Sequence, residues 1–174
     1  MTGYSIAAGE ETFPRHLCAS DMQLASGLLR LGFFVPDKTE QITRLRITTT
    51  GTAASGGTLL RFGVWMAMPN GDLRPLANTA NDTAIMGSTN TEYTKSWSQK
   101  WTKVKGQKYA FGALFVGTTG PRVPAAAVGS APAAFRLETR LAAVISGQAD
   151  LPSGVISNAS LGGTNAVPFA ELLP

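Results

Sequence analysis

A turn signal between two apolar runs, in residues 59–77 (LLRFGVWMAMPNGDLRPLA), restricts the fold of this chain more than any other stretch. Asn70-Gly71 between strand-like segments is the strongest short-range signal for a β-hairpin, because both residue types tolerate positive φ. One register of the first segment is uniformly apolar: Leu60, Phe62, Val64, Met66 and Met68. The other register is mixed: Arg61, Gly63, Trp65 and Ala67. This alternation predicts a strand with one face in a core and its second face only partly covered.

Similar alternation predicts strands at residues 41–50 (QITRLRITTT) and 109–116 (YAFGALFV), and residues 93–104 (YTKSWSQKWTKV) are expected to form another strand or a pair of strands. The strand at 109–116 is apolar on both faces, which is typical of a strand at the centre of a sandwich or beneath a second layer. Residues 51–57 form a connector, since this Gly-rich loop lacks the lysine and helix of a phosphate-binding loop.

In residues 20–35 two interpretations compete. Leu29, Leu31, Phe33 and Val35 alternate as in a strand buried on one side. A helix over residues 20–30 is the alternative, because Ser20-Asp21 can cap it. The glycines and the run from Phe33 to Val35 favour the strand.

The composition favours an all-β domain with extensive contacts. Only 15% of the 174 residues are charged, whereas glycine (19) and proline (10) are plentiful. We expect an N-terminal extension (1–20), a β-sandwich domain (21–118) and an Ala/Pro/Gly-rich C-terminal arm (119–174). Residues 168–173 would return to the sheet as a last strand, and a helix over 133–145 is an alternative within the arm. Because the arm carries few charges, it should lie on its own domain or on neighbouring chains, which predicts a homo-oligomer.

Several classes of partner and cofactor are not expected. The net charge of +4 comes from scattered basic residues, which does not favour binding to nucleic acid. One cysteine, Cys18, and one histidine, His16, give neither an internal disulfide nor a zinc cluster. No metal and no cofactor is predicted. The N-terminus does not resemble a signal peptide, and no apolar run reaches the roughly 20 residues that cross a bilayer.

The sequence predicts no enzymatic activity. It contains no G-x-S-x-G, and His16, two residues after Pro14, is expected to be an ordinary surface or hydrogen-bonded residue. The acidic residues that could act as paired carboxylates are scattered along the chain: Asp72, Asp82, Glu92 and Glu138. The region 78–82 is rich in oxygen ligands but lacks the spacing of an EF-hand calcium loop.

Two groups of residues are candidates for contacts. Tyr93, Trp97 and Trp101 are expected on one strand face beside lysines, an arrangement that can hold sugar rings. The competing interpretation, which we favour, is that these aromatics pack in a sheet or subunit interface. Arg61 and Trp65, on the second face of the hairpin, are expected to contact the tail or a neighbouring subunit.

The order of these segments resembles a family of small virion proteins from tailed bacteriophages of actinobacteria, usually labelled minor tail proteins. The resemblance covers nearly the whole chain and rests on short segments: SDMQLASGLLRLGFFV before Pro36, ITRLRITTTGTA, PLANTANDTA, YAFGALFVGTTGPRV and the closing VPFAELL. The sequence departs from the family at Ala110 and Ala113 and has an extra Asn81.

The resemblance implies a jelly-roll-like antiparallel β-sandwich, assembly into a virion and no catalysis. The protein is then expected on the tail or capsid surface as a homo-oligomer, with a trimer the common arrangement, after synthesis in the host cytoplasm. Two functions are consistent with this: a structural or decoration protein acting through subunit contacts, or an adhesion module that binds host-surface glycan through Tyr93, Trp97 and Trp101.

Overall fold

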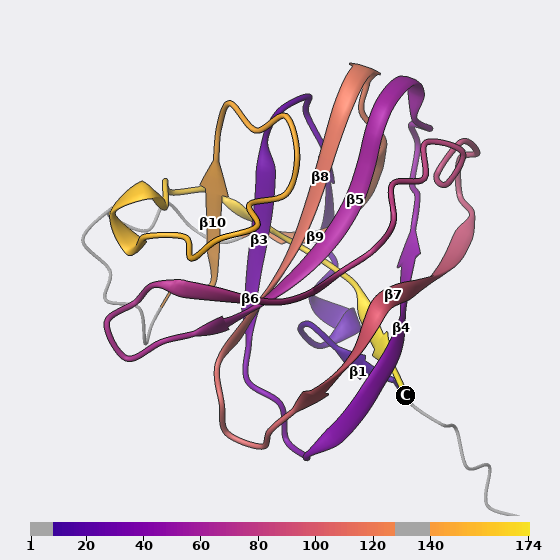
Figure 1. The fold of residues 1–174 in the computed structure, drawn as a ribbon. Helices are drawn as coiled ribbons and strands as arrows, with labels where there is room; N and C mark the ends of the chain where they lie inside the picture. Colours follow the sequence, from indigo (N-terminus) through magenta and orange to yellow (C-terminus); the bar gives the residue numbers. More distant parts are fainter. Residues whose placement is uncertain (1–8, 128–139) are drawn as a thin grey trace, which may run out of the picture.

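The computed structural model describes residues 9–127 and 140–174, which form antiparallel β-sheets (Figure 1). The four-stranded sheet has the order β1 (Glu10–Glu11), β12 (Glu171–Leu173), β4 (Glu40–Thr48) and β7 (Glu92–Lys103). The five-stranded sheet has the order β10 (Ala142–Ile145), β3 (Leu29–Phe34), β8 (Tyr109–Thr119), β5 (Ser55–Ala67) and β6 (Leu73–Asn78). The three-stranded sheet has the order β11 (Ala166–Pro168), β9 (Arg122–Ala127) and β2 (Ser20–Gln23). The helical elements of the described residues are the 3-10 turns η1 (Arg15–Leu17) and η3 (Asn158–Ser160).

The sheets form a sandwich around a main apolar core. Phe62 and Phe111 enter this core from the five-stranded sheet and stack with ring centroids 6.1 Å apart. Leu45 of the four-stranded sheet and Val123 of the three-stranded sheet face them from the opposite side. The prediction of an all-β, antiparallel sandwich is therefore confirmed, whereas the jelly-roll strand order remains a prediction.

The predicted hairpin is present as β5, a tight turn and β6. The Met68 amide donates to the Asp72 carbonyl at 2.8 Å, and Gly71 takes a φ of 91°. That φ is in the region that glycine adopts without steric cost. Asn70 supports the turn through its side chain, which donates to the Asp72 carboxylate at 2.7 Å.

The strand predicted to be apolar on both faces, residues 109–116, forms most of β8 and lies at the centre of a sheet, as expected. β8 is the central strand of the five-stranded sheet, between β3 and β5. Its odd-numbered residues from Tyr109 to Phe115 face the main core, while Ala110 and Leu114 face the opposite side. A strand that is apolar on both faces is stable in such a position, because each face is removed from water.

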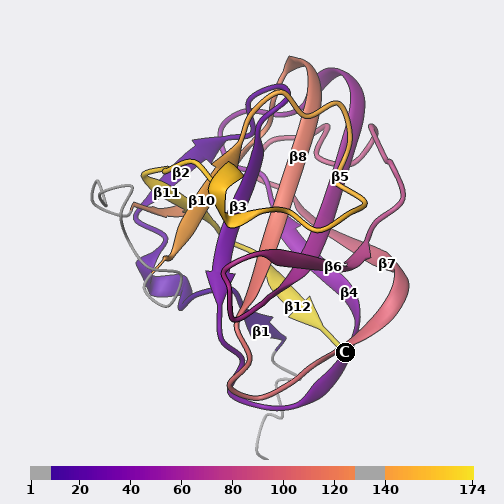
Figure 2. The same cartoon turned by 60° about the vertical axis from the view of Figure 1, so that its left-hand side comes forward.

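The opposite face of the five-stranded sheet is covered by residues 146–165, the segment between β10 and β11, here called the strap. In Figure 2 the strap crosses in front of β3, β8 and β5. Its apolar side chains form a second core with the sheet: Leu151, Ile156 and Leu161 pack with Leu31, Trp65 and Leu114. The expectation that this face of the hairpin is only partly covered is therefore wrong for Trp65, since the strap buries it.

The strap also closes both edges of the five-stranded sheet. Ile156 forms an antiparallel bridge with Leu73 on edge strand β6, and Gly162 forms one with Val144 on edge strand β10. Exposed strand edges attract strands from other chains. The two bridges therefore reduce the backbone surface that this sheet offers for edge-to-edge pairing.

Residues 20–35 form strands, which excludes the helix alternative. β2 and β3 are separated by a turn at residues 24–28, in which Gly27 adopts a φ of 72°. Leu29, Leu31 and Phe33 are buried as expected. Val35 is not buried, because the strand pairing ends at Phe34 opposite Tyr109.

The part of the chain after residue 118 contributes strands to all three sheets. The predicted boundary at 118/119 falls at the last residue of β8. Of the last strand predicted over residues 168–173, residues 171–173 form β12, which pairs with β4 and β1, whereas Pro168 ends β11. Within the alternative helix at 133–145, residues 142–145 form β10, and 133–139 lie outside the described residues. In the part of the chain that the structure describes, no helix is long and apolar enough to span a membrane.

Candidate functional site

The aromatic residues of β7 do not form an exposed platform. Alternation places Tyr93, Trp97 and Trp101 on one face of the strand as predicted, but that face is turned into the main core. Trp97 and Trp101 are each only 6% exposed, and their rings meet edge-to-face at 6.4 Å. Trp101 also lies against Tyr109, with centroids 5.5 Å apart. Sugar rings stack on accessible aromatic faces, so this trio packs the sandwich, in agreement with the favoured interpretation.

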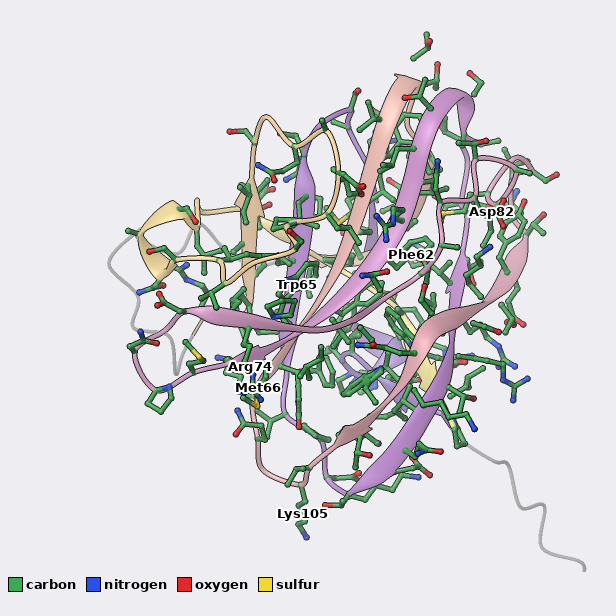
Figure 3. The ribbon with its side chains drawn as sticks, viewed as in Figure 1. Phe62, Trp65, Met66, Arg74, Asp82 and Lys105 are labelled. Atoms are coloured by element: carbon green, nitrogen blue, oxygen red, sulfur yellow. The ribbon has the colours of Figure 1, made fainter. Side chains whose placement is uncertain are left out.

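Arg61 and Trp65 contact the chain's own tail. The Arg61 guanidinium binds both oxygens of Asp150 in the strap, at 2.7 and 2.9 Å, and also donates to Asn78. Trp65 lies beneath the strap in the second core (Figure 3). The expectation of a contact with the tail is met. The alternative expectation, that Trp65 contacts a neighbouring subunit, is wrong, because the strap covers the face of β5 on which Trp65 lies.

In the oxygen-rich region 78–82, the side-chain oxygens of Asn81 and Asp82 form hydrogen bonds and an ion pair with other groups of the protein. The Asp82 carboxylate accepts from the amides of Ala84 and Ile85, at 3.1 and 3.2 Å, and forms an ion pair with Lys95 of β7. Asn81 accepts from the Leu60 amide at 2.9 Å. These bonds fasten the loop after β6 to the neighbouring strands. The pKa of Asp82 is lowered, mainly by the hydrogen bond from Lys95.

This lowered pKa predicts a pH dependence of stability. The side chain of an aspartate in an unfolded chain has a pKa of about 3.9. Because the folded state holds the Asp82 proton less tightly, its carboxylate stabilises the fold at pH values above that pKa and loses this effect as the pH falls through the lower folded pKa. In urea unfolding, the stability difference between wild type and Asp82→Asn should therefore shrink from neutral pH towards about pH 3. Lys95→Gln should weaken the same pH dependence, and parallel curves for wild type and Asp82→Asn would contradict this account.

An apolar groove lies where the end of β3, the start of β10 and the N-terminal segment meet. It has a volume of about 540 Å³. The groove is defined by its main apolar lining, which consists of Phe13, Leu17, Phe33, Val35, Leu141 and Val167. The rest of its lining is small or apolar apart from Glu11 and Thr12. Glu11 is already paired with Arg15, at 3.0 Å.

The rim of the groove exposes large apolar side chains. Leu17, Val35 and Leu141 are 48%, 56% and 58% exposed, and they account for most of the exposed large hydrophobic residues in the described chain. The two others, Val104 and Val155, do not line the groove. Single exposed apolar residues are ordinary on protein surfaces, whereas a cluster at a concave site indicates a contact surface.

The N-terminal wall of the groove is fixed by aromatic and polar contacts. Phe13 packs edge-to-face on Phe169 at 5.4 Å, and the Thr12 amide donates to the Ala170 carbonyl at 2.9 Å. Arg15 lies over the Phe169 ring at 5.7 Å. The short strand β1, with two residues, could not hold this wall by backbone pairing alone.

Buried ion pairs add to this attachment. The carboxylate of Glu171, on β12, is buried and paired with Arg15 and with Arg46, the latter at 3.0 Å. Lys103, whose side chain is fully buried, pairs with Glu10 of β1 and lies 3.4 Å from Glu40. Burial lowers the pKa of Lys103. Both networks connect the N-terminal segment to the four-stranded sheet, so the groove has a preformed wall.

A second depression, which is polar, lies beside this wall, but it does not have the features of a binding site. It has a volume of about 350 Å³, and its charged residues (Arg15, Arg46, Glu92 and Glu171) are paired with one another. Cys18 also lines it, but burial raises the pKa of that thiol, which lowers its reactivity as a thiolate. His16 is exposed on η1, and the described residues hold no group of three or more His, Cys, Asp or Glu side chains placed to bind a metal.

The amino-acid sequence contains no local signal for the groove. Leu17, Val35 and Leu141 lie far apart in the chain, and no periodic pattern links them. The alternation predicts Val35 in a buried register and gives no sign that pairing ends one residue earlier. The groove has apolar walls and few polar groups. It is therefore suited to bind an apolar surface, and it lacks the polar side chains that would orient a reacting group.

Comparison with known proteins gives no assignment: no protein-family model matches this sequence, and no curated protein matches it.

Proposed function

We propose that this protein is a structural component of a bacteriophage virion, on the tail or capsid surface, and that it acts through contacts between subunits. The groove carries this proposal. A preformed apolar surface with exposed Leu17, Val35 and Leu141 is unfavourable in water and becomes favourable when another protein surface covers it. The low charge content of the chain and the resemblance of its segments to minor tail proteins support the same proposal.

The proposed role requires a rigid domain and does not require reactive side chains. Both faces of the five-stranded sheet are buried, and the strap bridges its two edges. The partners in this proposal are further copies of the chain and other virion proteins. Catalysis has no part in it.

The structure gives no support to the glycan-binding alternative. It depended on Tyr93, Trp97 and Trp101 as an accessible platform, and the two tryptophans are buried in the core.

The proposal predicts that the chain is a stable part of assembled particles. Particles made from the genome that encodes it should contain its peptides after gradient purification and a high-salt wash, as detected by mass spectrometry. Cryo-electron microscopy should then place a β-sandwich of this size on the tail or the capsid. A major capsid protein serves as the positive control and a non-virion replication protein as the negative control. Recovery of the chain only in the particle-free fraction would contradict the proposal.

A further inference from the structure

We infer that the chain forms an internal covalent bond without an enzyme: an amide between the Lys103 side-chain nitrogen and the Glu10 side-chain carboxyl, with Glu40 transferring the proton. This modification goes beyond the proposed function and does not depend on it. The observation behind it is the burial of one amine together with two carboxylates. The Lys103 side chain is fully buried, contacts the Glu10 carboxylate and lies 3.4 Å from the Glu40 carboxylate. The side chains of Glu10 and Glu40 are only 13% and 24% exposed.

The reacting groups are held by three strands of the four-stranded sheet. Glu40 on β4 is paired directly with Lys103 on β7 in the strand register, and Glu10 comes from β1. The backbone amide of Asp37 donates to Glu10 Oε1 at 3.2 Å, while Glu10 Oε2 contacts Lys103 Nζ. Groups that are already fixed in contact react with a much smaller loss of entropy than groups that must first meet.

Lys103 differs from the other lysines in its environment. Burial lowers its pKa, because the charged ammonium is poorly solvated, and this increases the share of the free amine that can act as a nucleophile. The ion pair of Lys95 with Asp82 on the same strand lacks these features. Its side chains are 23% and 32% exposed, and among the described residues no second carboxylate pairs with Lys95.

Glu40 is placed to move a proton. Its Oε2 atom is buried and lies 3.4 Å from Lys103 Nζ and 3.1 Å from Lys38 Nζ, with a hydrogen bond of good geometry to neither. Its other oxygen accepts a hydrogen bond from Lys38 at 3.1 Å, which holds the carboxylate in position. A carboxylate fixed beside a reacting amine can accept a proton from it and return that proton to the leaving group.

The step is a condensation that releases one water molecule. A proton moves from the Lys103 ammonium to Glu10 Oε2, and the free amine then attacks the Glu10 carboxyl carbon. The negative charge that develops on Oε1 is stabilised by the Asp37 amide. Glu40 takes a proton from the attacking nitrogen and passes it to the Oε2 hydroxyl, which leaves as water while the carbonyl re-forms on Oε1. No oxidant, reductant or cofactor is required.

Burial also favours the product. Two charged groups removed from water carry a large desolvation cost, whereas the amide that replaces them is neutral. The new bond would join β1 to β7 between residues 93 positions apart in the chain. It would thereby attach the N-terminal wall of the groove to the sheet covalently.

The test is the mass of the intact full chain, measured by mass spectrometry under denaturing conditions. The wild type should be lighter than its sequence mass by one water, about 18 Da. Peptide mapping should find a branched peptide that joins Glu10 to Lys103. Lys103→Met should have the full sequence mass. Glu40→Gln, which keeps both reacting groups, should form the bond at least about 100-fold more slowly, while circular dichroism shows that it is folded.

The matched control is Lys95→Met, which removes the lysine of another ion pair on the same strand and should keep the loss of one water. A wild type of full sequence mass, or a loss of water without the branched peptide, would overturn the inference. Bond formation in Glu40→Gln at the wild-type rate would overturn the role of Glu40. The virion role is tested separately by recovery of the chain in particles, so either proposal can fail while the other holds.

Discussion

Replacing Trp65 with alanine is expected to lower the free energy of unfolding by about 3–5 kcal/mol, the range measured for large aromatic side chains in cores. Trp65 is nearly fully buried, with Leu31 and Leu114 beside it and the strap residues Leu151 and Ile156 above. Its indole nitrogen has no hydrogen-bond partner among the described residues. The loss is therefore one of packing, and the cavity would lie between the sheet and the strap.

Two glycines beneath the Trp65 ring make the cavity left by Trp65→Ala larger, because they have no side chains that could fill it. Gly63 of β5 and Gly112 of β8 are directly paired across the two strands. A Cβ at either position would lie within 2.4 and 2.6 Å, respectively, of the Trp65 ring. The indole ring of Trp65 thus packs on the backbone of both glycines. Its removal would leave both backbone positions without packing contacts.

Urea unfolding monitored by circular dichroism measures this prediction. Trp65→Phe keeps most of the aromatic volume and should cost less than Trp65→Ala. Val155→Ala, on the exposed part of the strap, is the matched control and should change stability by no more than about 0.5 kcal/mol. A cost for Trp65→Ala below about 1 kcal/mol would mean that the strap does not depend on this contact.

Replacing Gly120 with alanine is expected to cost about 3 kcal/mol, at the upper end of overpacking effects. Gly120 lies in the tight turn between β8 and β9. An added Cβ would lie only 1.8 Å from the carbonyl oxygen of Leu24, and 3.3 Å from the Phe115 ring. Because the nearer atom is backbone, no rotation of a side chain can relieve the collision.

The collision would also break a connection between sheets. The Leu24 amide donates to the Pro121 carbonyl at 2.9 Å, which holds the turn after β2 against the turn after β8. Gly154→Ala is the control, because a Cβ there meets no atom within 4 Å. Thermal unfolding of the two variants should separate clearly, with only Gly120→Ala melting well below the wild type. Equal melting temperatures would show that the turns can move apart without loss.

Much of the strand content was predictable from local pattern. The period-two alternation of residues 41–50 and 109–116 and the Asn70-Gly71 turn located β4, β8 and the β5–β6 hairpin. These predictions succeeded because side chains on a strand alternate between two faces and because few residues accept a tight turn. The position of β8 at the sheet centre followed from the same reasoning, since both of its faces are apolar.

The candidate sites were less predictable. Alternation gave the correct common face of Tyr93, Trp97 and Trp101, but it did not tell whether that face points to solvent or to the core. For Arg61 and Trp65, the sequence indicated that something covers the second face of the hairpin. Only the fold identified that cover as the strap, through Asp150 and Ile156.

The sequence alone determined that this chain forms an antiparallel β-structure with a hairpin at residues 59–77, because strand periodicity and turn chemistry act between residues close in the chain. The tertiary structure alone decided which faces are exposed. It buried the tryptophans of β7, laid the strap over Trp65, and brought Leu17, Val35 and Leu141 from distant segments to one apolar groove. Exposure depends on contacts between segments far apart along the chain, and no local pattern records them.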